Sequence, residues 1–216
     1  MKKVLWFLIP LFCAQGLFAQ GQVNFSNRIL PDYITAVYGV DAADPHSPKT
    51  GNSPADLPPG TTMYGGAPLS GSGFTVQLWA APGITPDENA LALIPDGTSS
   101  FRTLGGAGFW IPKTVAVPGV MGGLGTHATA QVRVWDNLGG LITTWQDAQT
   151  AWQSGLIAAG ESPLFGIDNL GPDSSSAADL RNMVSFQLWS PVAIPEPAVT
   201  SIAFVCCLVG CLRKRL

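Results

Sequence analysis

Three six-residue segments decide the fold that this chain is expected to adopt: Phe74-Thr75-Val76-Gln77-Leu78-Trp79, Ala130-Gln131-Val132-Arg133-Val134-Trp135 and Val184-Ser185-Phe186-Gln187-Leu188-Trp189. Each alternates apolar and polar residues and ends in tryptophan. Because side chains of a strand point alternately to its two faces, Val76 and Leu78 are predicted on one face, and Gln77 and Trp79 on the other. The three segments therefore predict β-strands with one apolar face.

The fold class predicted from this pattern is mainly β, an antiparallel β-sandwich with one short helix, occupying residues 20–194. The predicted core residues are those of the apolar faces: Val76, Leu78, Val132, Val134, Phe186 and Leu188. Further strands are expected at 22–27, 34–40, 90–94, 100–104, 109–111 and 114–117. A turn is expected at Pro95-Asp96-Gly97, and hairpin turns at the glycine-rich stretches 105–108 and 122–125.

One segment has helical rather than strand periodicity. Trp145, Ala148, Trp152 and Leu156 fall on one face of a helix with 3.6 residues per turn. Thr143 or Thr144 can cap its first turn, and Gly155 can end it. We therefore expect a short helix over 144–153 that packs over one end of the sandwich.

A long loop is expected at 41–73, which holds six prolines and six glycines in 33 residues. Loops of this length are usually functional or disordered, and a flexible surface excursion is the favoured interpretation. Asp41, Asp44 and His46 lie at its start. A metal site would need more ligands at tighter spacing, so no metal site is predicted.

Both ends of the chain resemble targeting segments. Lys2 and Lys3 precede the apolar stretch 4–12, and Leu17-Phe18-Ala19 ends in a small residue. This arrangement predicts a helical signal peptide at 1–19, removed by signal peptidase before Gln20.

The other end, 195–216, has three parts: Pro195-Glu196-Pro197, an apolar transmembrane stretch at 198–212, and the basic residues Arg213, Lys214 and Arg215. The 16 residues between Glu196 and Arg213 would span roughly 24 Å as a helix, less than the ~30 Å hydrocarbon core. A tail this short is typical of a transient stop that an enzyme later removes. An ordinary membrane anchor is the alternative.

This tail resembles the PEP-CTERM sorting signal of diderm bacteria, in which Pro195-Glu196-Pro197 would be the motif and 198–216 the hydrophobic helix and basic end. The resemblance covers about a tenth of the chain. It implies that an exosortase-type membrane protease recognises the motif, and that the protein passes from the inner membrane to the cell surface or extracellular matrix. The bodies of proteins with this signal and a similar opening at 23–28 have no assigned activity.

Charge and cysteine content restrict the function further. Five of the 11 basic residues and one of the 14 acidic residues lie in the targeting ends, which leaves 6 basic and 13 acidic residues, a formal charge near −7. An acidic, lysine-poor surface argues against nucleic acid as a partner. All four cysteines lie in the ends, so the body has no disulfide and no cysteine-based metal site or nucleophile.

No catalytic, cofactor or metal residues are assigned. The two histidines, His46 and His127, lie 81 residues apart, and no nucleophile elbow or metal motif accompanies them. The expected function is a non-enzymatic structural or adhesive component of an extracellular polysaccharide matrix. The alternative is a carbohydrate-binding module, in which the strand-end residues Trp79, Trp135 and Trp189 would contact a glycan, and a secreted hydrolase comes third.

Overall fold

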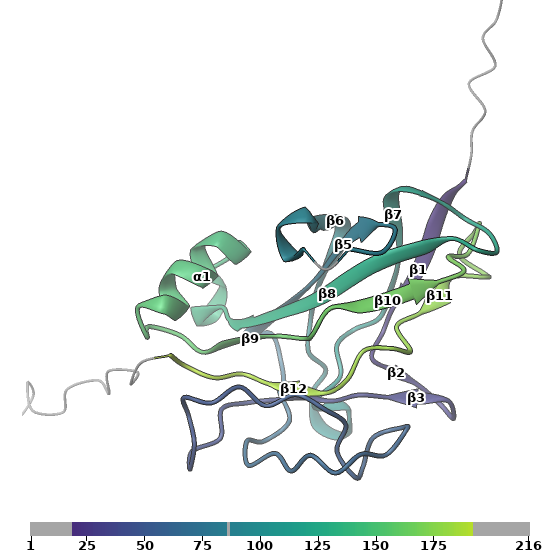
Figure 1. Cartoon of the computed structure of the whole chain (residues 1–216). Coiled ribbons are helices and arrows are strands. Elements are labelled where there is room, and N and C mark those ends of the chain that lie inside the picture. Colours follow the sequence, from purple (N-terminus) through teal and green to yellow (C-terminus); the bar gives the residue numbers. More distant parts are fainter. Residues whose placement is uncertain (1–18, 86, 192–216) are drawn as a thin grey trace, which may run out of the picture.

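The computed structural model describes residues 19–85 and 87–191, which form a mainly β body with one α-helix (Figure 1). The sorting motif, the basic end and all but the last residue of the expected signal peptide lie outside the described residues. The main strands are β1 (Gln20–Phe25), β5 (Phe74–Pro82), β6 (Ala92–Ser100), β7 (Lys113–Met121), β8 (His127–Asp136), β9 (Ala159–Glu161) and β10 (Phe165–Asp168). Two-residue strands are β2 (Arg28–Ile29), β3 (Tyr33–Ile34), β4 (Val37–Tyr38), β11 (Ala178–Asp179) and β12 (Phe186–Gln187), and the helix is α1 (Trp145–Gln153).

Two sheets build the upper part of the body. One has the strand order β11-β1-β7, and the other has the order β10-β8-β5-β6, with β9 also pairing with β8. β5 and β8 are antiparallel and place Val76 opposite Val134 and Leu78 opposite Val132. The alternation that predicted these two strands is therefore confirmed, and their apolar side chains form matched cross-strand pairs.

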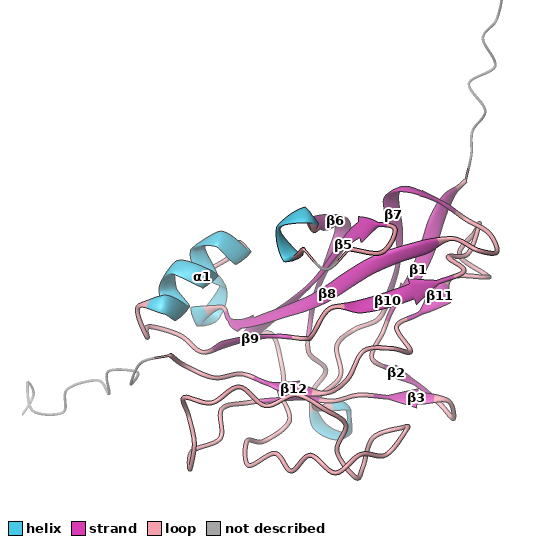
Figure 2. Cartoon of the chain, viewed as in Figure 1, coloured by secondary structure: helices cyan, strands magenta, loops and turns pink. Residues whose placement is uncertain are grey.

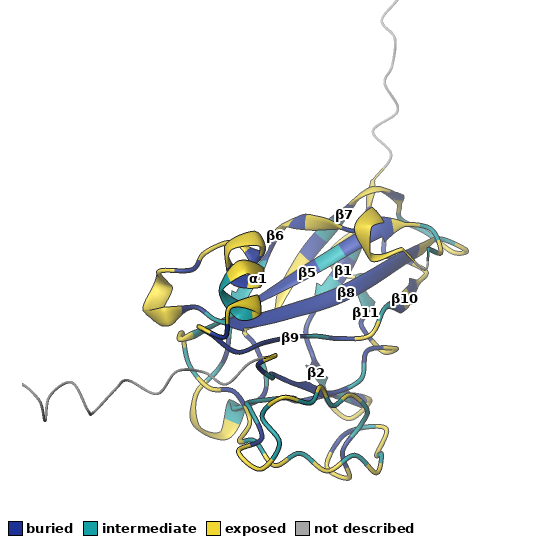
Figure 3. Cartoon of the chain, turned by 60° about the vertical axis from the view of Figure 1, so that its left-hand side comes forward, coloured by how far each residue is buried: buried dark blue, intermediate teal, exposed yellow. Residues whose placement is uncertain are grey.

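The two sheets share a core. Val23 and Phe25 of β1 belong to the same buried cluster as Val76 and Val134 of the second sheet. All six predicted core residues are 0–1% exposed. The apolar faces of the strands are thus packed against one another. Figure 3 shows β5 and β8 coloured as buried over most of their length.

The third quoted segment departs from its prediction. Only Phe186–Gln187 is a strand, and it pairs with β4 in parallel rather than antiparallel. β11 also pairs with β1 in parallel. The arrangement is therefore not purely antiparallel. Phe186 and Leu188 are buried as predicted. The segment lies against β9 and joins it at one point, where Trp189 and Ala159 form an antiparallel bridge.

Two turn predictions need correction. Residues 95–97 lie inside the continuous strand β6, where the pairing with β5 shifts register and Asp96 has a φ of 59°. This is a bulge rather than a turn between two strands. The stretch 122–125 joins β7 to β8, which belong to different sheets, so it is not a hairpin turn. The stretch 105–108 also joins strands of different sheets, β6 and β7, but here the chain reverses on itself as predicted: Phe101 and Trp110 on either side form an antiparallel bridge.

The predicted helix is confirmed. The Thr144 side chain accepts a hydrogen bond from the Asp147 backbone N–H and donates one to the Asp147 carboxylate at 2.6 Å. This reciprocal contact caps the first turn. Gly155 follows the helix with a φ of 73°, a left-handed conformation that favours glycine. Leu156 is 54% exposed, so the apolar face ends one turn earlier than predicted.

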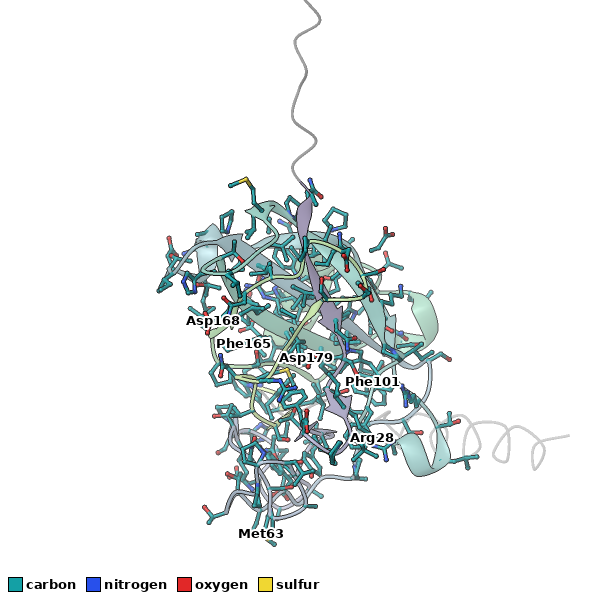
Figure 4. All side chains as sticks on the ribbon, turned by 90° about the vertical axis from the view of Figure 1, so that its right-hand side faces the viewer. Arg28, Met63, Phe101, Phe165, Asp168 and Asp179 are labelled. Carbon is teal, nitrogen blue, oxygen red and sulfur yellow. The ribbon has the colours of Figure 1, made fainter. Side chains whose placement is uncertain are left out.

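The segment 41–73 forms an irregular lower layer (Figure 2), with Met63 near its far end (Figure 4). It lacks long strands, as predicted, yet it is tied to the body. The Tyr64 hydroxyl lies 2.6 Å from the Gly51 carbonyl oxygen and 2.8 Å from that of Ser185, so its single proton can be donated to either. The Tyr64 ring stacks on Tyr38 with 4.1 Å between centroids. The buried Asp56 carboxylate accepts a 2.8 Å hydrogen bond from the Ser185 hydroxyl. The layer is an anchored surface, not a loose excursion.

No helix in the described part of the chain is both long enough and apolar enough to cross a membrane. The expected transmembrane stretch at 198–212 lies outside that part.

Candidate functional site

A cavity of about 350 Å³ lies between helix α1 and the outer face of strands β5 and β8. Its lining includes Trp79 of β5, Arg133 of β8, Glu161 of β9 and Trp145 of α1. The remaining lining residues are the apolar Leu91 and four polar side chains: Glu88, Asn89, Gln146 and Gln149. We call this the Arg133 cavity.

Strand register explains why these side chains meet. Arg133 lies opposite Gln77 of β5 on one side and opposite Glu161 of β9 on the other. Trp79 is two residues beyond Gln77, so its side chain leaves the sheet on the same face. Because Val76, Val132 and Val134 occupy the inner face, the outer face of β5 and β8 is the one left for polar and aromatic side chains.

Arg133 is held from several sides and is 8% exposed. Its guanidinium carbon lies 4.3 Å from the centroid of the Trp79 ring and 5.3 Å from that of the Trp145 ring. Its Nε donates to the Gln131 side-chain oxygen at 2.8 Å and lies 3.4 Å from the Glu161 carboxylate. The cation therefore joins the helix to the sheet through two aromatic rings and one ion pair.

Burial opposes the charge of both partners in this pair. It lowers the pKa of Arg133 and raises the pKa of Glu161, while each charge favours the ionised form of the other. Arginine remains protonated, because its ordinary pKa lies far above neutrality. Glu161 is therefore the titrating member of the pair, and the charge of Arg133 opposes the rise that burial causes in its pKa.

The three tryptophans that the sequence suggested as glycan contacts do not form an exposed row. Trp135 is fully buried and donates its indole N–H to the Ile142 carbonyl at 3.0 Å, so it cannot touch a ligand. Trp189 is half-buried, and its ring lies edge-on to Trp152 with 4.9 Å between centroids. Of these three suggested contacts, Trp79 alone lines the Arg133 cavity, where Trp145 of helix α1 is a second lining tryptophan.

Of the residues that line this cavity, the sequence pattern indicated only Trp79 as a candidate contact. Glu88 begins the 3₁₀ turn Glu88–Ala90, and Glu161 ends β9, so chain topology alone brings them together. Arg133 could have been recognised as a candidate, because it is the single charged residue within the segment 130–135. A charge placed there needs a partner on the face opposite the core.

A second cavity, of about 270 Å³, contains His127 and Asp168, whose Nδ1 and Oδ1 atoms are 2.7 Å apart. Both side chains are exposed, and Asp168 lies on β10 (Figure 4). The described residues that line this cavity include no serine or cysteine, but they include two threonines. The Thr129 hydroxyl donates to the Gly83 carbonyl at 2.9 Å, and the Thr85 hydroxyl accepts from the Asp87 backbone N–H at 3.1 Å. Among the described residues, these hydroxyls therefore bond to the backbone and not to His127, which would have to act as the base for a nucleophile.

The charged residues at the start of the loop have structural partners. Asp41 accepts from the Lys49 ammonium at 2.6 Å and from the Ala43 N–H, and His46 Nδ1 lies 2.7 Å from the Ser190 carbonyl. Across residues 19–85 and 87–191, no three histidine, cysteine or acidic side chains gather as metal ligands would.

Comparisons with protein-family models, with curated proteins and with solved structures found no match.

Proposed function

We propose that this chain is an exported, non-enzymatic component of an extracellular polysaccharide matrix, and that it adheres to the polysaccharide through the Arg133 cavity. One observation carries the proposal: an indole ring, amides and carboxylates line a single cavity on a rigid sheet face. The proposal joins the structural role expected from the sequence to its carbohydrate-binding alternative. The body that presents the cavity is interpreted as a β-sandwich with short parallel additions.

The lining has the chemistry that saccharides require. Sugars present apolar C–H faces, which pack on aromatic rings, and hydroxyl groups that need hydrogen-bond partners when they leave water. Trp79 supplies part of an indole, while Asn89, Gln146 and Gln149 supply amides that both donate and accept. A few placed polar groups around an apolar surface are typical of small-ligand sites.

Rigidity supports the same role. Trp79 donates its indole N–H to the Gln77 side chain at 3.2 Å, and its ring is fixed by Arg133. Glu88 is held by Gln131, whose side-chain amide donates to the Glu88 carboxylate at 3.2 Å. Side chains held in this way lose little conformational freedom when a ligand binds.

The targeting segments at the two ends determine where the protein is delivered. Under this proposal, signal peptidase releases the chain before Gln20, and an exosortase-type protease recognises Pro195-Glu196-Pro197. The precursor then resides in the inner membrane, and the product at the cell surface or in the matrix. The acidic body fits a partner other than nucleic acid.

Isothermal titration calorimetry of the full chain, held in a sugar-free detergent, against hexasaccharides of different composition tests the proposal. We expect saturable binding to at least one neutral or amino-sugar hexamer, and a loss of at least ten-fold in affinity in Trp79→Ala.

Phe109→Ala is the matched control, because Phe109 also carries a guanidinium, that of Arg28, 5.4 Å from its ring centroid. It lies outside the cavity and should bind normally. Absence of binding to every hexamer, or equal losses in both variants, would contradict the proposal. Hydrolysis of the hexamer would instead favour the hydrolase alternative.

A further inference from the structure

The Arg133 cavity has more negative than positive side chains in its lining. Two carboxylates, of Glu88 and Glu161, and one guanidinium, of Arg133, belong to its lining. The guanidinium is 8% exposed and is already covered by Trp79, Trp145 and Glu161. What the cavity presents to solvent is therefore acidic.

Glu88 is the more accessible carboxylate. It lies at the start of an exposed 3₁₀ turn, whose cap Asp87 accepts from the Asn89 N–H at 2.9 Å. One Glu88 oxygen accepts a hydrogen bond from the Gln131 amide, which restrains the carboxylate, and Glu88 is part of the cavity lining. Glu161 lies deeper, with a side chain 26% exposed beside Arg133.

Global charge acts in the same direction. The region between the targeting ends has a formal charge near −7, from 6 basic and 13 acidic residues. A surface with this excess repels polymers of uronic acids or sulfated sugars and attracts cationic ones. The local and the overall charges thus favour the same class of ligand.

From this geometry, and resting on the proposed function, we infer that the Arg133 cavity selects a polysaccharide whose sugars carry protonated amines, such as a partly N-deacetylated amino-sugar polymer. The Glu88 carboxylate accepts hydrogen bonds from the ammonium group, the indole packs on the sugar ring, and the amides hydrogen-bond the sugar hydroxyls. A cationic peptide would satisfy the charge alone, whereas the amide-rich lining with Trp79 also fits a hydroxylated ring. An amine paired with an exposed carboxylate is expected to tighten binding by about five-fold.

The experiment measures dissociation constants of the full chain for four hexamers: β-1,4-linked glucosamine, its N-acetylated form, oligogalacturonate and hexalysine. Titrations are made at low ionic strength and at a pH at which the glucosamine amine is protonated. We expect the glucosamine hexamer to bind about five-fold more tightly than the N-acetylated hexamer, and this preference to weaken with salt. In Glu88→Gln, the ratio of the two affinities should fall to about one.

Asp96→Asn is the matched control. Asp96 is an exposed carboxylate outside the cavity lining, and asparagine tolerates its positive φ. Its ratio should equal that of the unaltered chain.

Equal binding of the two glucosamine-based hexamers would overturn the inference and leave the proposed function intact, whereas no binding of any saccharide would overturn both. Stronger binding of oligogalacturonate, or of hexalysine, would also overturn the inference. A ratio that falls as far in Asp96→Asn as in Glu88→Gln would assign the preference to overall charge and reject the role of Glu88.

Discussion

Replacing Arg133 with methionine removes the one cation that joins helix α1 to the sheet. Methionine retains most of the buried stem and can still contact the two rings. The guanidinium contributes about 0.5–1 kcal/mol with each of Trp79 and Trp145. Loss of the ion pair and of the hydrogen bond to Gln131 adds about 1–2 kcal/mol, because Glu161 is only partly exposed. Arg133→Met should therefore lower the free energy of unfolding by about 3 kcal/mol.

The pH dependence of this deficit follows from Glu161. Burial already raises the pKa of Glu161, and without Arg133 it rises further. A carboxyl whose pKa is higher in the folded than in the unfolded state opposes folding above that pKa, and the penalty disappears as pH falls below it. The deficit of Arg133→Met relative to the unaltered chain should thus be largest near pH 7 and shrink in acid. Adding Glu161→Gln should recover part of the loss at pH 7.

Urea unfolding of the unaltered chain, Arg133→Met and the double variant, each at pH 7 and pH 5, measures these differences. Arg28→Met is the control, because its guanidinium lies over Phe109 outside the cavity. For a body of this size, about 3 kcal/mol corresponds to a fall of about 6–12 °C in melting temperature. A deficit that is the same at both pH values and in the double variant, or no larger than that of Arg28→Met, would refute the reasoning.

Three further predictions follow from the fold and its ends. Val134 is fully buried between facing sheets, so Val134→Asp should abolish the cooperative unfolding transition and the protease resistance of the body; a folded variant would contradict the assigned core. The ammonium of Lys49 lowers the pKa of Asp41, which contributes stability above the unfolded pKa and loses it as pH falls. Asp41→Asn should therefore destabilise the protein at pH 7 and less at pH 3, and an equal effect at both would reject this ion pair. For the ends, mass spectrometry of exported protein should find Gln20 at or near the start and no peptides that extend to Leu216. Glu196→Ala should leave unprocessed precursor in the inner membrane. Retention of Met1 or of an intact tail on the exported protein would contradict the sorting proposal.

Local periodicity was sufficient to predict strands β5 and β8 and helix α1. Alternation in 74–79 and 130–135 requires only that one face be buried, and a capped 3.6-residue pattern identifies the helix wherever it packs. The segment 184–189 has the same alternation, but it forms only a two-residue strand, which pairs with the equally short β4, while Trp189 makes a single bridge to β9. Periodicity predicts which side chains are buried better than it predicts which strands pair.

The candidate site was less predictable, because it depends on contacts between distant parts of the chain. Trp79 and Trp135 hold equivalent places in their segments, yet one lines a cavity and the other is buried beside Trp145 of the helix. Nothing in either hexapeptide distinguishes them. Glu88 and Glu161 reach Arg133 through a turn and a separate strand, so no spacing in the sequence could have grouped them.

Whether the Arg133 cavity is a saccharide site is tested most directly by a nuclear magnetic resonance titration that follows the indole N–H signals. The six tryptophans of the described body report from distinct positions: Trp79, Trp110, Trp135, Trp145, Trp152 and Trp189. On addition of an amino-sugar hexamer, we expect saturable shifts of the Trp79 and Trp145 signals, with Trp110 unchanged because it is buried in the core between the two sheets. Shifts centred on Trp152 and Trp189, or no saturable shift at any indole, would contradict this expectation.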